Sequence, residues 1–166
     1  MIKLLRLLAL SLVLFTTACG WQLRGAGGGG FDGVPIALEG AAGNRMLDAV
    51  AVELRRLGAE VVASAAESEW VIRIDSAQAV RRAVATDADG FASEYELRYQ
   101  LAFVLTPGGQ ANAAALAGER QTVQTTAAYS ATPGNLQGQQ AEEEQLEREL
   151  REDAIRLMLA RLGRRL

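Results

Sequence analysis

Apolar and polar side chains alternate over residues 91–105, and this alternation constrains the fold more than any other feature of the chain. Successive side chains of a β-strand point to opposite faces, so a period of two predicts a long strand with one buried face and one wet face. The predicted buried face comprises Phe91, Tyr95, Leu97, Tyr99, Leu101, Phe103 and Leu105, and the predicted wet face Glu94, Glu96, Arg98 and Gln100. The apolar face of such a sheet needs a second layer to cover it.

Three further segments have the character of strands. Alternation from Trp70 to about Val84, and again over residues 120–129, predicts two antiparallel neighbours for the long strand. A short apolar run at residues 34–38 contains a proline, which suits an edge strand or the start of a strand. Residues 111–117 are rich in alanine, and their pattern is compatible with a loop or with the return arm of a hairpin.

Two helices are expected to form the covering layer. Apolar residues at helical spacing predict a helix over about residues 45–57, with Asn44 as its N-cap and Gly58 as its end. The C-terminal third is predicted to be one long helix, because acidic residues lie near its start and arginines near its end. Its apolar face suits a sheet or a membrane surface, and we expect the sheet because the acidic residues weaken attraction to an anionic membrane.

The order of elements is therefore β-α-β-β-β-α. This order predicts the α/β (α+β) fold class, as a two-layer sandwich of two helices on a four-stranded mixed sheet. The sheet is expected to be mixed because the first strand joins it after a helical crossover.

The N-terminus has the features of a bacterial lipoprotein signal. Lys3 and Arg6 precede an apolar run at residues 7–15, and the small residues 16–18 precede Cys19, the only cysteine of the chain. This is the order of a secretory signal, and cleavage after residue 18 would leave a thiol free to take a lipid. The apolar run is shorter than the roughly 20 residues of a transmembrane helix. A membrane-spanning anchor and an unlipidated secreted protein remain the alternatives.

We expect three parts in the chain. Residues 1–18 are the lipoprotein signal peptide, residues 19–33 are the lipidated N-terminus with a glycine-rich tether, and residues 34–166 form a single domain. Residues 25–30 hold five glycines and are typical of a flexible linker. A phosphate-binding loop is not predicted there, because no strand precedes the glycines and no helix beginning with Lys-Ser/Thr follows.

The residue content excludes several classes of enzyme. The chain has no histidine, and its single cysteine is assigned to the lipid, so Ser-His-Asp and Cys-His catalysis are excluded together with zinc sites built on these residues. We expect no enzyme, no catalytic residue, no metal and no cofactor, although an enzyme that uses only carboxylates stays open. The net charge of −3 argues against nucleic acid as a partner.

The segment from Cys19 to Gly25, which reads Cys-Gly-Trp-Gln-Leu-Arg-Gly, resembles the mature start of the LPS-assembly lipoprotein family LptE. The element order is also similar to the family's fold, as are Glu94-Tyr95, Asp153-Ala154 and Arg161-Leu162. The resemblance implies a non-enzymatic lipoprotein of the outer membrane that plugs the lumen of the LptD β-barrel and binds lipopolysaccharide. In this family the lipid is attached to the cysteine, here Cys19, and the Gly that follows it agrees with sorting to the outer membrane.

Arg81 and Arg82 are the candidate contacts for lipopolysaccharide, which is anionic and phosphorylated. Relatives place basic residues around the turn between the second and third strands, whereas this turn holds Asp87 and Asp89 and the two arginines lie just before it. Adjacent strand residues face opposite sides, so at most one of the two arginines serves any one surface. Two exposed arginines without a ligand remain a possible interpretation. The alternative function is a lipid-anchored periplasmic binding module with an unrelated ligand.

Overall fold

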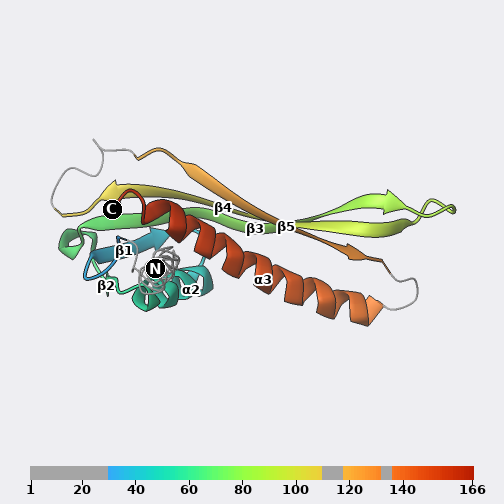
Figure 1. Cartoon of the computed structure of the whole chain (residues 1–166), viewed down its shortest axis with the longest axis horizontal. Coiled ribbons are helices and arrows are strands. Elements are labelled where there is room, and N and C mark those ends of the chain that lie inside the picture. The colour runs from blue at the N-terminus through green and yellow to red at the C-terminus, as the bar shows by residue number, and fades with distance from the viewer. Residues whose placement is uncertain (1–29, 110–117, 132–135) are drawn as a thin grey trace, which may run out of the picture.

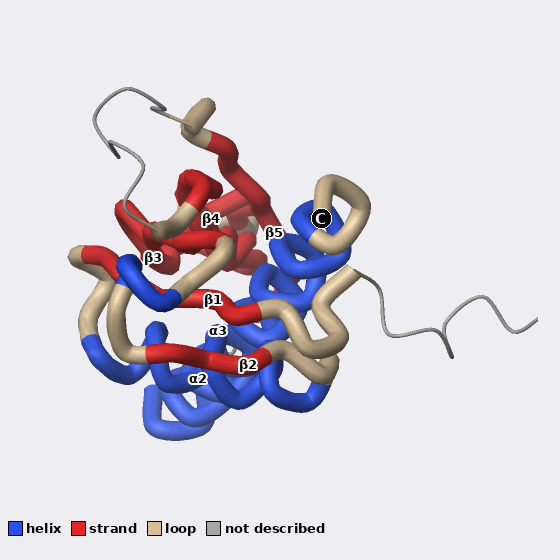
Figure 2. Tube along the Cα trace, turned by 90° about the vertical axis from the view of Figure 1, so that its left-hand side faces the viewer, coloured by secondary structure: helices blue, strands red, loops and turns tan. Residues whose placement is uncertain are grey.

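The computed structural model describes residues 30–109, 118–131 and 136–166. These residues form an elongated two-layer sandwich, in which two α-helices cover the same face of one sheet (Figures 1 and 2). The predicted α+β class is confirmed. The predicted signal peptide, Cys19, all of the tether before residue 30 and residues 111–117 lie outside the described residues.

The described strands form a five-stranded mixed sheet in the order β2-β1-β3-β4-β5. Their bounds are β1 Pro35–Gly40, β2 Glu60–Val62, β3 Trp70–Thr86, β4 Ala92–Pro107 and β5 Gln121–Ser130. β1 runs parallel to β2 and β3, whereas β4 is antiparallel to β3 and β5, which confirms the mixed sheet. The predicted number of four strands is wrong, because β2 has three residues and is too short to show a period in the sequence.

Two α-helices of the described residues form the covering layer. Helix α2 spans Asn44–Arg56 and helix α3 spans Leu136–Leu162, with a 3₁₀ turn, η1, at Ala65–Glu67. The helix predicted at residues 45–57 is confirmed, but Asn44 is not its N-cap. Gly43 holds that position with a φ of 85°, and no side chain caps the first turn. A positive φ suits glycine, which explains why the cap falls one residue earlier than predicted.

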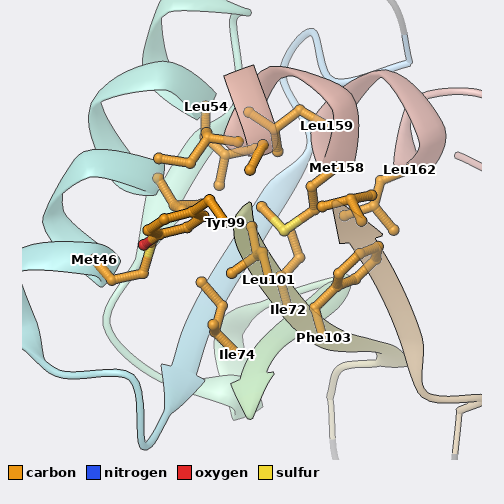
Figure 3. Close-up of a cluster of buried hydrophobic side chains, with 14 of the residues drawn as sticks. Met46, Leu54, Ile72, Ile74, Tyr99, Leu101, Phe103, Met158, Leu159 and Leu162 are labelled. Atoms are coloured by element: carbon orange, nitrogen blue, oxygen red, sulfur yellow. The ribbon is translucent and has the colours of Figure 1, made fainter. Parts of the chain in front are cut away.

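The core lies between the helices and the inner face of β4 (Figure 3). Leu101 and Phe103 are 0% exposed, and Met158 of α3 packs in the same cluster. The alternation therefore predicted the buried face of β4 correctly, with one exception. Phe91 is 70% exposed because it precedes β4 and lies in the turn.

The hairpin of β3 and β4 forms a long arm, which we define as residues 79–98. Figure 1 shows its tip extending past the start of α3, at the end of the molecule opposite the C-terminus. Side chains near the tip have little cover, and Val80 and Val84 are 49% and 45% exposed. The arm therefore carries the candidate arginines Arg81 and Arg82 away from the main core.

Candidate functional site

Arg81 and Arg82 lie on opposite faces of the sheet, as a period of two requires. Arg81 pairs across the sheet with Leu97, whose side chain is buried on the face that the helices cover. Arg82 pairs with Glu96 on the uncovered face, which we name the open face. The two arginines therefore have different surroundings and are described separately.

Arg81 belongs to a network that joins the arm to α3. Its Nη1 atom lies 2.8 Å from Oε2 of Glu143, and its guanidinium carbon lies 4.9 Å from the centre of the Tyr95 ring. The Tyr129 hydroxyl donates to the same Glu143 oxygen at 2.7 Å, and the rings of Tyr95 and Tyr129 are stacked with centroids 5.7 Å apart. We name these four residues the arm clamp, since they connect β3, β4, β5 and α3.

The pKa shifts in the arm clamp keep Tyr129 protonated and Arg81 charged. Burial raises the pKa of the Tyr129 hydroxyl, and the hydrogen bond to Glu143 raises it further, so the hydroxyl stays protonated and can donate at neutral pH. Contacts with the Tyr129 hydroxyl and with Glu143 raise the pKa of Arg81, which stays charged. A polar hollow of about 390 Å³ beside Arg81 is lined by Gln140, Glu143, Glu144 and Glu147. These acidic surroundings make Arg81 a poor contact for an anion.

Arg82 is more exposed to solvent than Arg81, and it shares its acidic partner, Glu96, with Arg98. Its Nη2 atom lies 3.3 Å from Oε1 of Glu96, and Nη2 of Arg98 lies 2.9 Å from the same oxygen. We name Arg82, Glu96 and Arg98 the open-face triad. Two guanidinium groups on one carboxylate leave one positive charge and several N–H donors unused. The Arg82 side chain is 64% exposed, so these donors are accessible from solvent.

Hydrogen bonds to Asp87, a residue of the turn itself, stabilise the turn at the tip of the arm. Oδ1 of Asp87 accepts hydrogen bonds from the backbone N–H of Asp89 at 3.0 Å and of Phe91 at 2.9 Å. This local pattern is the usual role of Asp in turns. The turn therefore offers an anion no basic side chain, in contrast to the arrangement that the family resemblance implies.

Away from the open-face triad, the open face carries further polar and charged side chains, whereas Val71, Ala102 and Val104 on the same face are buried near the start of β3 and the end of β4. Asp75 lies at a register shift in β3 and is shared by Arg73, at 3.0 Å, and Arg120, at 3.4 Å. Further along, Nε2 of Gln100 donates to Oε1 of Gln124 at 3.4 Å across β4 and β5. Such a face suits extended polar contacts with another macromolecule.

Two features that would indicate other functions are missing from residues 30–109, 118–131 and 136–166. No group of three or more acidic or cysteine side chains there is arranged to hold a metal ion. Within the same ranges, no helix combines the length and the apolar character needed to cross a membrane.

The sequence and the fold match known lipoproteins. Residues 34–162 match the family LptE, whose description is lipopolysaccharide-assembly. This chain belongs to the LptE family. The match covers nearly all of the domain predicted at residues 34–166 and confirms the predicted resemblance to this family.

Solved structures with the same fold as this LptE chain come from several bacteria. The lipoprotein B from Nitrosomonas europaea is 24% identical, with a TM-score of 0.69 over 87% of this chain and 90% of that one. The rare lipoprotein B from Shewanella oneidensis is 20% identical, with a TM-score of 0.66 over 78% and 93%. A minor lipoprotein from Acinetobacter baumannii is 15% identical, with a TM-score of 0.64 over 81% and 94%. No curated protein matches the chain significantly.

The sequence pointed to two residues of this candidate site and missed their partners. Glu143 is 62 positions from Arg81, and no local pattern links them. The alternation of β4 placed Glu96 and Arg98 on one face, which was the available signal for the open-face triad. The contact between them and Arg82 required the register of β3 against β4.

Proposed function

We propose that this LptE chain is a lipid-anchored, non-enzymatic protein of the outer membrane that assembles with an LptD-type β-barrel and plugs its lumen. In this role it takes part in the transport of lipopolysaccharide and its insertion into the outer leaflet. The match of residues 34–162 to the lipopolysaccharide-assembly family carries the proposal. The proposal includes a signal peptide at residues 1–18, a lipid on Cys19, a tether at residues 19–33, and a domain at residues 34–166 on the periplasmic side and inside the barrel.

The open face is the surface that suits the barrel. The lumen of a large barrel is polar and wet, so a plug must present polar side chains to it. The middle of the open face does so with Gln100 and Gln124, and with the exposed Thr126 on β5. The apolar faces of both helices are turned inward against the sheet. We therefore assign the barrel contact to the open face of β4 and β5.

Arg82 and Arg98 are the proposed contacts for lipopolysaccharide phosphates, and Arg81 is assigned to the arm clamp. Guanidinium groups bind phosphate through paired N–H donors. An exposed ion pair such as Arg82 with Glu96 contributes about 0–1 kcal/mol, so exchanging the carboxylate for a phosphate costs little. The pair of Arg81 with Glu143 is supported by a tyrosine hydroxyl and a ring, which makes the same exchange less favourable.

Capture of lipopolysaccharide by the unlipidated mature chain tests this assignment. The double variant Arg82→Gln, Arg98→Gln is expected to bind immobilised lipopolysaccharide at least about tenfold more weakly, since a hydrogen bond to a charged group contributes about 1.5–3 kcal/mol net of competition from water. The control variant Arg45→Gln, Arg148→Gln removes the same charge from exposed positions on α2 and α3, and should bind like the wild type. Equal binding by all three proteins would show that the open-face triad is not the contact.

A further inference from the structure

A groove lies between the C-terminal ends of the two helices. It has a volume of about 300 Å³. Its floor is apolar, with Phe31, Leu57, Leu159, Ala160 and Gly163, and its rim holds Glu53, Arg56, Arg156 and Arg164. We name it the helix-end groove. Its lining combines an apolar floor with a basic rim, which is the pattern expected for an amphiphilic anion.

The helix-end groove lies where the proposed tether meets the folded body. The described chain begins at Gly30, which packs so closely on α3 that an added Cβ would lie 2.7 Å from the carbonyl oxygen of Gly163. Gly163 lines the groove, and so does Phe31, the residue that follows Gly30. Figure 1 shows the C-terminus of α3 at the end of the molecule opposite the tip of the arm. A lipid on Cys19 would therefore hold this end of the body near its membrane.

Charge is divided between the two ends of the segment formed by α3 and the four residues that follow it. Residues 136–152 contain six glutamates and two arginines, whereas residues 153–166 contain one aspartate and four arginines. The helix dipole favours basic residues in the last turn. The dipole does not account for an apolar groove between the two basic helix ends.

The rim keeps positive charge after its internal ion pairs are counted. Arg56 pairs with Glu53, its Nη2 atom lying 2.5 Å from Oε1, and Arg156 pairs with Asp153. Arg164 has no carboxylate partner within the described ranges. The Arg56 side chain is 64% exposed, so it can contact an external anion while it remains paired.

We propose that the helix-end groove binds an anionic phospholipid of the membrane that holds the lipid anchor, with an acyl chain on the groove floor and the phosphate at Arg56 and Arg164. This inference rests on the proposed lipid anchor at Cys19. Each basic residue near an anionic bilayer strengthens binding about fivefold. A single lipid on a glycine-rich tether leaves the body free to rotate, whereas a phospholipid in the groove fixes which end of the elongated body faces the membrane.

Flotation with vesicles tests the inference, using the complete mature chain with Cys19→Ser so that its own lipid does not drive binding. Vesicles of phosphatidylethanolamine and phosphatidylglycerol at about 3:1 should bind the wild type more tightly than vesicles of phosphatidylcholine. The variant Arg56→Gln, Arg164→Gln should bind the anionic vesicles about 25-fold more weakly, from two residues at about fivefold each. The matched control is again Arg45→Gln, Arg148→Gln, which should bind like the wild type.

A third variant separates the groove from simple surface charge. Ala160→Gln places a polar side chain in the groove without changing the net charge, and it should weaken binding to the same vesicles several-fold. Wild-type binding by this variant, or by Arg56→Gln, Arg164→Gln, would overturn the inference. Tighter binding after Trp21→Ala would overturn it too, because the tether would then be the occupant. Recovery of the native protein with a barrel partner does not depend on these results, so a failure here is distinct from a failure of the proposed function.

Discussion

Replacing Cys19 by alanine is expected to abolish acyl labelling of the chain. The thiol of Cys19 is the only one in the chain, so no other residue can take a thioether-linked lipid. Incorporation of radiolabelled palmitate into the wild type and into the variant measures the effect.

The neighbouring variant Thr17→Ala is the control for Cys19→Ala. It keeps the thiol and exchanges one small residue for another just before the cleavage site, so labelling should persist. Equal labelling of the Cys19→Ala chain and the wild type would refute the lipid anchor.

Replacing Phe103 by alanine is expected to destabilise the domain by about 3–5 kcal/mol, because the loss of a buried aromatic ring removes packing and leaves a cavity. Phe103 is 0% exposed and packs in the core between β4 and the helices (Figure 3). In a domain of this size the change should lower the unfolding temperature by about 10 °C or more. Chemical and thermal unfolding of the unlipidated mature chain measure both quantities.

Val52→Ala is the control for Phe103→Ala. Val52 lies on α2 and is 64% exposed, so its truncation should change the free energy of unfolding by about 0.5 kcal/mol or less. A loss below about 1 kcal/mol for Phe103→Ala would contradict the assignment of the inner face of β4 to the core.

The parts of the fold that the sequence predicted well are those with a long, unbroken period. β4 has 16 residues, and its alternation showed both its type and its orientation, although the expected wet face is wrong for its second half, where Ala102 and Val104 are buried as well. β2 was missed because three residues carry no period, and its position depends on parallel pairing with β1. Phe91 was placed in the core because the pattern continues past the start of β4, whereas Asp87 turns the backbone there.

The sequence predicted the candidate site only within a single strand, and not its contacts with other elements. The period of two placed Arg81 and Arg82 on opposite faces, which the structure confirms. The difference between them comes from residues far away in the sequence. Glu143 and Tyr129 engage Arg81, and they reach it only after α3 has packed on the sheet. The helix-end groove has the same origin, since it is formed by the ends of two helices about 100 residues apart in the chain.

Recovery of the lipidated chain from solubilised outer membranes tests the central claim most directly. With an affinity tag after Leu166, the wild type should be recovered together with a large, heat-modifiable barrel protein. The variant Gln124→Lys, Thr126→Lys should lose most of this partner, because two added charges on the open face would be buried against the lumen wall. Ala141→Lys, Gln145→Lys adds the same charge at two exposed positions one turn apart on α3 and should retain the partner. Recovery of the wild-type chain alone after gentle extraction would contradict the account.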